Sequence, residues 1–477
     1  MDSPQESIAG EWWLPENPSE RRTGTVKYGD GRFPNLEILQ GWHEAPEIPT
    51  SDGGSITMLD SFEPTRPGAS HDIFDRAVIH GTTVGLEPMS LLKARDYPGT
   101  IHIGNALGSI HKRVVEASVL VIGAHVDSLD SLMVSEMHLA HSCGSLMLQE
   151  TGLSQFIWNE SPDDEGGGFD VKWRETAPIV AQLSNGVSLT LGTTGSASPV
   201  RRNGDSVSTH MQSTPRLSIS SDAEWGFFEL WTGVLAPLNS LVRFAANHHG
   251  GWLRINGSSS GMPVQIFHRE IAPPLSEDIS LRHRPTFYLD RVSDDLAPVV
   301  ETWLALMDEL GSSVQQGLNA LESTESAERV RQLALALEGL PDTSQYESPF
   351  REFWEAIKKA LKAAVPTSLE DAIVNRAGSM LGPSLQDRLE ILAEEIEARE
   401  VEVPASVRGA FGDVKTVRNA MSHPRNNEQL SQAEIRRADA CATALFRAAI
   451  LARLPFDVTA GCRSILGEAN DEIEQWS

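Results

Sequence analysis

The sequence predicts an α+β protein in which a β-rich N-terminal domain is followed by an all-helical bundle. Up to about residue 270, short β-prone runs alternate with turn-forming residues. Residues 273–285 contain Pro273-Pro274 and several polar residues, which is typical of a linker. Beyond them, apolar residues recur at helical spacing. We therefore divide the 477-residue chain into a domain at 1–272, a linker at 273–285 and a domain at 286–477.

Short apolar runs predict the strands of the first domain. The clearest hairpin is formed by Ile179–Leu183 and Val187–Leu191, because Ser184-Asn185-Gly186 between them is typical of a tight turn. Gly29-Asp30-Gly31 predicts a second one. The further predicted strands are Thr25–Tyr28, Leu36–Leu39, Ile73–His80, Leu86–Leu92, Val114–Val126, Trp252–Ile255 and Val264–Phe267.

Other stretches of this domain predict turns, loops and one helix. Gly81-Thr82-Thr83 should break the strand before it. The acidic, glycine-rich Asp163–Gly168 and the Ser/Thr-rich Gly195–Ser213 should be exposed loops. Asp222–Asn247 is the one long helical candidate, with apolar residues spaced to cover a core.

The second domain is predicted to consist of helices throughout. Leu296–Leu310 and Glu325–Leu340 have helical periodicity, and Ser348-Pro349 should open a third helix. Ser384 with Asp387 and Ser431 with Glu434 are capping patterns of later helices, the last being Ile435–Leu454. The third helix carries an apolar stripe with core spacing, formed by Phe350, Phe353, Trp354, Ile357 and Leu361.

Val417–Pro424, which reads V-R-N-A-M-S-H-P, is the strongest functional candidate. Arg418 lies in the apolar stripe of its helix, where a guanidinium needs a partner or a polar cleft. Pro424 ends the helix and leaves His423 near that end. A fixed cation suits a phosphate and an imidazole can transfer a proton near neutral pH, so Arg418 and His423 suit RNA cleavage. The stripe consists of Val407, Phe411, Val414, Val417 and Met421.

The spacing of Arg and His is weak evidence by itself. Arg243 and His248 repeat it, but an apolar Phe244 follows that Arg, whereas the polar Asn419 follows Arg418. His248 more simply marks the end of a helix, where Gly250 supplies the turn.

Arg418-Asn419-Ala420-Met421-Ser422-His423, together with the upstream S-L-Q-D-R-L-E-I-L-A-E-E-I, resembles the HEPN superfamily. It resembles in particular the HEPN domain at the C-terminus of ApeA-like anti-phage proteins. Arg418, Asn419 and His423 match the family signature of an Arg, a polar residue and a later His. The resemblance implies an all-helical domain that dimerises, so that two motifs share one cleft, and that often acts as a metal-independent ribonuclease.

The first domain resembles the N-terminal domain of the same ApeA-like proteins. The resemblance is carried by the order of several pieces, namely Glu11–Pro15, the hairpin with T-G-T-V-K-Y and L-E-I-L, I-H-G near Ile79, and V-L-V-I-G-A-H at Val119–His125. It implies a sensing or regulatory domain and transfers no site residues.

Charge restricts how RNA could bind. The net charge of −27 argues against broad electrostatic binding of nucleic acid. Residues 404–437 are an exception, with six basic and three acidic residues. The expected RNA-binding residues of this patch are Lys415, Arg425, Arg436 and Arg437.

Composition sets further limits. There is no apolar run of membrane-spanning length and no signal-peptide pattern at the start, so we expect a cytoplasmic protein without a membrane partner. Three cysteines without metal spacing should be reduced thiols. His125, Asp127 and Asp130 have ligand chemistry but suit a strand end equally well. We expect neither a metal nor another cofactor.

The predicted function is that of a hydrolase, a metal-independent endoribonuclease in anti-phage defence by abortive infection. RNA is the expected substrate, a homodimer or higher homo-oligomer the expected assembly, and a phage protein or other ligand at the first domain the expected trigger. One alternative is a non-catalytic HEPN-like dimer that senses or binds a nucleotide or partner. Another is a carbohydrate-binding or hydrolytic β module with a helical oligomerisation tail, which would require paired carboxylates.

Overall fold

The computed structural model falls into two compact units, residues 1–293 and 294–477, and each is described by itself. The predicted linker, apart from Pro285, and the turn at Gly29-Asp30-Gly31 lie outside the described residues. The structure describes residues 6–28, 33–39, 47–49, 55–57, 77–97, 112–128, 130–143, 156–161, 168–173, 177–197, 201–203, 206–208, 211–248, 250–268, 285–344, 346–348, 351–366, 369, 374, 382–422 and 430–477.

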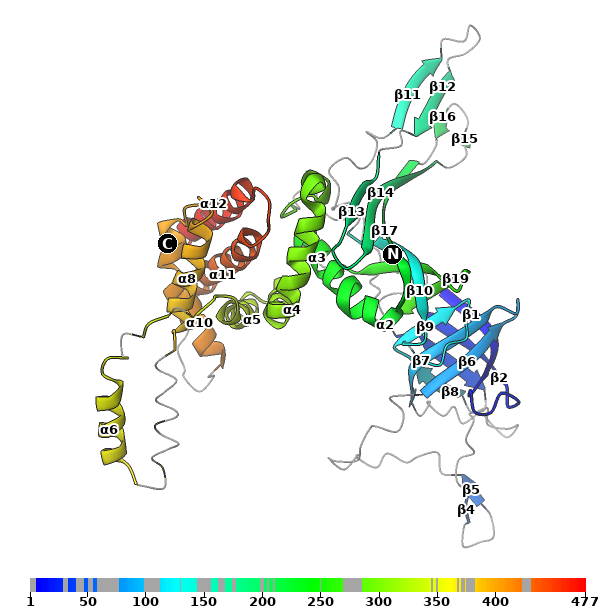
Figure 1. Cartoon of the computed structure of the whole chain (residues 1–477), viewed down its shortest axis with the longest axis horizontal. Coiled ribbons are helices and arrows are strands. Elements are labelled where there is room, and N and C mark those ends of the chain that lie inside the picture. Colours follow the sequence, from blue (N-terminus) through cyan, green and yellow to red (C-terminus); the bar gives the residue numbers. More distant parts are fainter. Residues whose placement is uncertain are drawn as a thin grey trace. The chain divides into compact units, whose positions relative to one another are not determined.

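The first unit is built on an antiparallel sheet of 13 strands, in the order β13-β14-β17-β10-β18-β19-β9-β7-β6-β1-β2-β3-β8 (Figure 1). Three separate hairpins accompany it, β4-β5, β11-β12 and β15-β16. The strands are β1 Glu6–Trp13, β2 Arg22–Tyr28, β3 Asn35–Leu39, β4 Glu47–Pro49, β5 Ser55–Thr57, β6 Ala77–Thr83, β7 Pro88–Tyr97, β8 Lys112–Glu116, β9 Val119–Ile122, β10 Met133–His141, β11 Phe156–Ser161, β12 Gly168–Trp173, β13 Ile179–Gln182, β14 Val187–Ala197, β15 Arg201–Asn203, β16 Ser206–Ser208, β17 Met211–Gly226, β18 Trp252–Ser259 and β19 Met262–His268.

One end of this sheet closes on itself. β8 pairs with both β3 and β7, so that six strands form a ring around buried side chains that include Trp12. A Cβ on Gly81 would lie 2.4 Å from Cε3 of Trp12. The close approach of this indole explains why Gly81 continues β6, although the sequence predicts a break there. The chain turns at Val84–Glu87 instead, where Leu86 has φ 67°.

Other predictions for this unit require correction. Val114–Val126 is not one strand, because Ala117 and Ser118 separate β8 from β9. The predicted loop Gly195–Ser213 contains strand residues, since β17 pairs with β14 from Ala197 back to Val187. The Ser/Thr-rich composition did not reveal this long-range pairing. The hairpin at Ser184-Asn185-Gly186 is confirmed, with Gly186 at φ 83°.

The predicted long helix begins five residues later than expected, because β17 extends through Asp222 to Gly226. It consists of α2 Phe227–Leu230, a π-helical turn Trp231–Leu235 and α3 Ala236–Ala246. Asn247 ends it in the left-handed conformation, the role that the sequence assigned to a glycine. The helix buries Leu235, Leu238 and Leu241.

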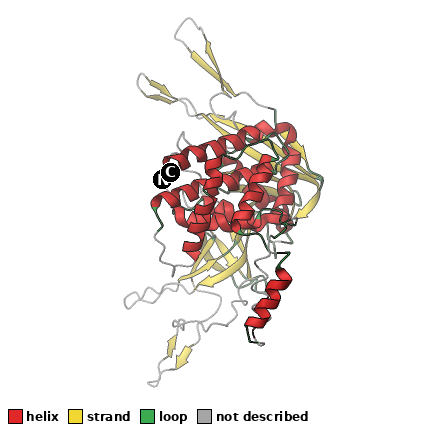
Figure 2. Cartoon of the chain, turned by 90° about the vertical axis from the view of Figure 1, so that its left-hand side faces the viewer, coloured by secondary structure: helices red, strands yellow, loops and turns green. Residues whose placement is uncertain are grey.

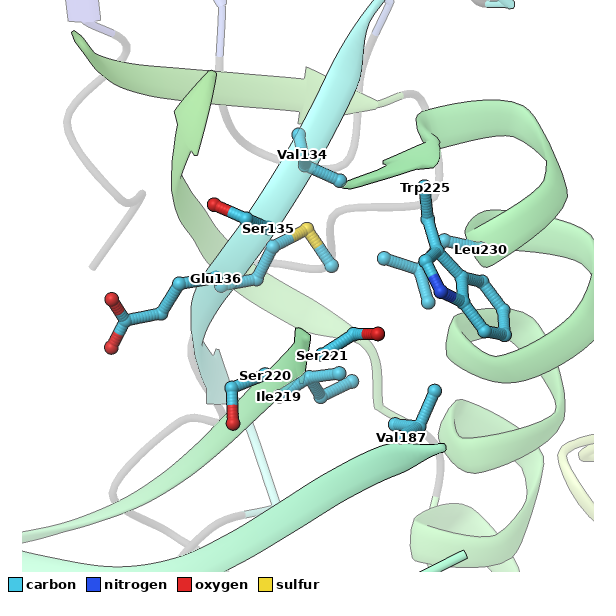
Figure 3. A pocket seen from close by; sticks show the side chains of 10 residues that line it. Val134, Ser135, Glu136, Val187, Ile219, Ser220, Ser221, Trp225 and Leu230 are labelled. Atoms are coloured by element: carbon cyan, nitrogen blue, oxygen red, sulfur yellow. The ribbon is translucent and has the colours of Figure 1, made fainter. Parts of the chain in front are cut away.

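A small cavity lies between β10, β14, β17 and α2, lined in part by Val134, Val187, Trp225 and Leu230 (Figure 3). Its volume is about 10 Å³, roughly the space of one water molecule. In Figure 3 the Glu136 carboxylate points away from this space. The cavity is therefore too small to be a metabolite site.

The second unit is helical, and its long helices pack side by side (Figure 2). A 3₁₀ segment, Leu289–Asp295, precedes its first helix. Its helices are α4 Leu296–Leu321, α5 Ser326–Gly339, α6 Trp354–Ala364, α8 Leu385–Glu397, α9 Ala405–Gly409, α10 Phe411–Ser422, α11 Gln432–Ala452 and α12 Thr459–Gln475. Together with the large antiparallel sheet, these helices confirm the predicted α+β fold class.

The most extensively buried helix is α11, which contacts α5, α8, α10 and α12. The predicted small face is confirmed, since Ala438, Ala442 and Ala449 are buried. A Cβ on Gly317 of α4 would lie only 2.1 Å from Cε2 of Phe446. α4 therefore needs a glycine at this contact. The capping boxes at Ser384 and Ser431 are both present.

The third predicted helix differs from the expectation. α6 begins at Trp354 rather than after Ser348, and none of its residues is buried. The described residues of its apolar stripe, from Phe353 to Leu361, are therefore not part of a core, although the spacing is that of a core helix. Phe353, at its N-cap, is 61 % exposed. Among the described residues, no helix is long and apolar enough to cross a membrane.

His141 is a buried ionisable group in the sheet unit, only 5 % exposed. Its Nε2 lies 2.8 Å from Oδ1 of Asn239, and its Nδ1 accepts a hydrogen bond from the amide of Cys143. Nε2 therefore carries the proton of a neutral ring. Burial lowers the pKa of His141 to about 4, against the Asn239 hydrogen bond, which raises it.

We expect His141 to make the stability of the sheet unit depend on pH. The unfolded ring binds a proton below about pH 6.5 and the folded ring below about pH 4, so stability falls as pH drops through this interval. The full loss is roughly 3 kcal/mol, at about 1.4 kcal/mol per pKa unit. Urea unfolding of the full chain and of His141→Gln, followed by tryptophan fluorescence at several pH values, should show a weaker pH dependence for the variant. Parallel curves would contradict this assignment.

Candidate functional site

Helix α10 places the predicted Arg and Asn near its C-terminal end. Phe411, Val414 and Val417 are fully buried, as the stripe predicted, and Met421 is partly exposed. These contacts fix the rotation of the helix, so that Arg418 lies at the border between core and solvent. The last residue of α10 is Ser422. His423 and Arg425 lie outside the described residues.

Arg418 has the partner that its position in the stripe predicted. Its Nη2 lies 2.9 Å from Oε1 of Glu338 on α5, and both side chains are somewhat more than a quarter exposed. Nη1 donates to Oδ1 of the exposed Asn419 at 3.2 Å. Nε is buried and has no hydrogen-bond partner among the described residues. The guanidinium is therefore held on one side by a carboxylate, with its Nη1 edge toward Asn419.

A second set of polar contacts joins α5 to the start of α8. The Glu338 carbonyl accepts from Nη1 of Arg388 at 2.5 Å. One residue earlier, Asp387 closes the capping box with Ser384 and accepts from the Tyr346 hydroxyl at 3.1 Å. Burial would raise the pKa of Asp387, but the Ser384 and Tyr346 hydrogen bonds outweigh it and the pKa lies below the usual value. This carboxylate is an ionised neighbour of Lys415.

The four predicted RNA-binding residues are not equivalent. Lys415 is exposed on α10. Arg436 is partly exposed, and its Nε has no hydrogen-bond partner in the described part of the chain. Arg437 is engaged by Asp413, with Nε 2.7 Å from Oδ2, and also donates to the Trp476 carbonyl. The Asp413 contact raises the pKa of Arg437 and offsets its charge. Arg425 is not described.

Sequence reasoning missed Glu338, Arg388 and Asp387 as neighbours of the motif. All three come from helices distant in sequence from α10. Glu338 is near the end of a helix whose other residues gave no functional pattern. The sequence indicated that Arg418 needed an acidic partner, but it did not indicate which acidic residue this would be.

Two of the residues considered as metal ligands, His125 and Asp127, make other contacts. His125 stacks on His80, with ring centroids 4.9 Å apart, and its Nε2 lies 2.8 Å from the Gly81 carbonyl. Asp127 is 3.3 Å from Nε2 of His80. Across the ranges that the structure describes, no group of three or more His, Cys, Asp or Glu residues could hold a metal ion.

An antiparallel sheet unit followed by a helical unit with an Arg-Asn pair at a helix end defines the class of protein, a two-domain α+β chain. Comparison with family models places it further. The model described as ApeA N-terminal domain 1 matches residues 7–303, and the model described as Apea-like HEPN matches residues 332–459.

The chain belongs to the ApeA family, and its two domains fit an ApeA-like anti-phage defence protein. HEPN domains are generally nucleases. No curated protein and no solved structure matches the chain.

Two of the ion pairs that involve α5, Arg418–Glu338 and Arg329–Asp439, should differ in their effect on stability. Arg418→Ala should cost the helical unit about 1 kcal/mol or less, because the Glu338 carboxylate can be solvated. Arg329→Ala should cost about 3 kcal/mol or more, since it strands the Asp439 carboxylate, which is 8 % exposed and accepts from Nε of Arg329 at 2.7 Å. Chemical unfolding followed by circular dichroism tests this order. A larger loss for Arg418→Ala would make Arg418 a structural residue.

Proposed function

We propose that the chain is a metal-independent endoribonuclease that acts in anti-phage defence by abortive infection. The observation that supports this most is the placement of Arg418 and Asn419. They lie at the partly exposed end of α10, directly before the segment that contains His423, in a domain of the Apea-like HEPN family. A cation, an amide and an imidazole within six residues of sequence are the groups that RNA cleavage requires.

The chemistry uses a group that RNA itself supplies. Its 2′-hydroxyl lies next to the scissile phosphate, so cleavage needs a base for that proton, a cation for the charge of the phosphorane, and an acid for the leaving oxygen. His423 acts as the base or the acid. Arg418 holds the phosphate, and Asn419 orients both.

The contact with Glu338 determines how Arg418 presents itself. Because Glu338 binds Nη2 and Nε is buried, the Nη1 edge beside Asn419 is the side from which a phosphate approaches. Glu338 thus fixes the plane of the guanidinium before the substrate arrives. The exposed Lys415 and the partly exposed Arg436, together with Arg425, add positive charge for the RNA backbone, and Arg437 contributes less because Asp413 offsets it.

A homodimer completes the site. One chain carries one His423, and two proton transfers are needed. Two copies related by a two-fold axis supply two imidazoles to one cleft without a metal. In this proposal the sheet unit restrains the approach of the helical units until it binds a phage protein or another ligand, which shifts the population toward the active dimer.

A non-catalytic, HEPN-like dimer that senses or binds a nucleotide or partner remains the second candidate. The ion pair between Arg418 and Glu338 favours it, because a guanidinium that already contacts a carboxylate attracts a phosphate less strongly.

His423→Ala should lower the rate of RNA cleavage by the purified full chain by a factor of about 100 or more, while the protein stays folded. The imidazole has no substitute within its own chain if the proposal is correct. Gel assays of RNA decay at matched purity, with circular dichroism as the folding check, measure both properties.

His248→Ala is the matched control, since Arg243 and His248 repeat the same spacing at the end of α3. Its RNase activity should equal that of the wild-type chain. Equal cleavage by wild type and His423→Ala would leave the non-catalytic candidate.

Cleavage should persist in excess EDTA and leave 2′,3′-cyclic phosphate ends, because the neighbouring hydroxyl is the nucleophile. A DNA of the same sequence should remain intact, since it lacks that hydroxyl. Mass spectrometry of the product ends tests the chemistry. Activity that returns only on addition of Mg²⁺ or Zn²⁺ would assign the reaction to a metal instead.

A further inference from the structure

Helix α6 has an apolar face that the described part of the chain leaves partly exposed. Trp354, Ile357 and Leu361 follow one another at intervals of three and four residues and so form one row, and Phe353 extends it at 61 % exposure. None of the residues of α6 is buried. A helix of 11 residues is marginal in water without such a contact. The apolar row of α6 therefore needs a partner surface to pack against.

The charge of α6 is opposite to that of the chain. Residues 351–364 hold four basic and two acidic residues, whereas the whole chain has a net charge of −27. Lys358 and Lys362 are one turn apart beside the apolar row, and Lys359 lies on the opposite side of the helix. Lys358 also has a long contact with Glu355, at 3.8 Å. A partner for this helix should combine apolar and acidic groups.

The end of α12 has this combination. Glu468, Glu472 and Trp476 are four residues apart and exposed, and Trp476 is 41 % exposed. The other side of α12 is occupied, since Ile465, Leu466, Ala469 and Ile473 are buried. The carboxylates of Glu468 and Glu472 are thus complementary to the ammonium groups of Lys358 and Lys362. The indole of Trp476 is complementary to the apolar row of α6.

We propose that α6 of one chain docks on the C-terminal half of α12 of a second copy of the chain. In a two-fold pair each copy supplies one α6 and one α12 surface, so the contact forms twice. Lys358 and Lys362 then face Glu468 and Glu472, while Trp354 and Leu361 pack against Trp476.

Other occupants fit the observations less well. An anionic lipid surface would attract the lysines and the apolar row, but it would repel the rest of a chain with a net charge of −27. An RNA backbone would use the lysines and leave the apolar row uncovered.

Engineered cysteines test the contact directly, because the three natural cysteines are buried. Lys358→Cys chains mixed with Glu472→Cys chains and mildly oxidised should give a disulfide-linked dimer with one chain of each kind. Lys359→Cys, on the far side of α6, is the matched control and should link poorly to Glu472→Cys. Linkage no better than this control overturns the proposal. So does a Lys358→Cys/Glu472→Cys chain that links within itself at high dilution.

Charge reversal supplies a second readout that uses neither RNA nor cleavage. Lys358→Glu/Lys362→Glu should weaken self-association of the full chain by about tenfold or more in sedimentation velocity, and mixing with Glu468→Lys/Glu472→Lys chains should restore it. Lys359→Glu should change it little. Failure to restore association overturns the pairing. The proposal is also overturned if Lys358→Glu/Lys362→Glu loses binding to anionic vesicles while its self-association is unchanged. Because Arg418 and His423 are untouched, either result leaves the proposed ribonuclease to be judged separately.

Discussion

Close packing around α11 is the constraint on which the helical unit depends. Its Ala-rich face lets α5 and α10 approach closely, and the glycine of α4 at position 317 admits the Phe446 ring. α10 is thereby fixed between α5 and α11 with Val414 and Val417 in the core. The rotation that buries these valines is the rotation that brings Arg418 to Glu338. Packing, rather than the ion pair, therefore determines where the motif lies.

Ion pairs in this unit follow from the same packing. Arg329 and Asp439 meet where α5 contacts α11, and Arg437 meets Asp413 where α11 contacts α10. Each pair holds a charge that the interior would otherwise disfavour. Arg418 differs in degree, because its pair is more exposed than that of Asp439 and one of its edges faces Asn419. Packing places Arg418 at a helix end, and the Glu338 carboxylate contacts only one edge of its guanidinium. Such a cation is suited to binding an anionic ligand.

The sequence predicted local features well and long-range ones poorly. Caps at Ser384 and Ser431 and the turn at Gly186 depend on a few adjacent residues, and each was found. The extension of β17 to Met211 depends on pairing with β14, and Gly81 continues a strand because of the Trp12 ring. Both causes are distant in sequence. The motif at Arg418 was found because its residues are neighbours, whereas Glu338 could be inferred as a type of residue and not as a position.

The periodicity of α6 shows a limit of pattern reasoning that concerns function. An apolar stripe predicts that a helix will be covered, and it does not specify by which molecule. In the described part of the chain no residue of the α6 stripe is buried, so the same pattern that failed as a prediction of the core becomes evidence for an interface. The proposed ribonuclease has a similar requirement, because its mechanism uses two proton transfers and one chain carries one His423. In the two proposals above, association of two copies would cover this helix and supply the second imidazole, and a nuclease assembled in this way would be inactive while its chains are apart.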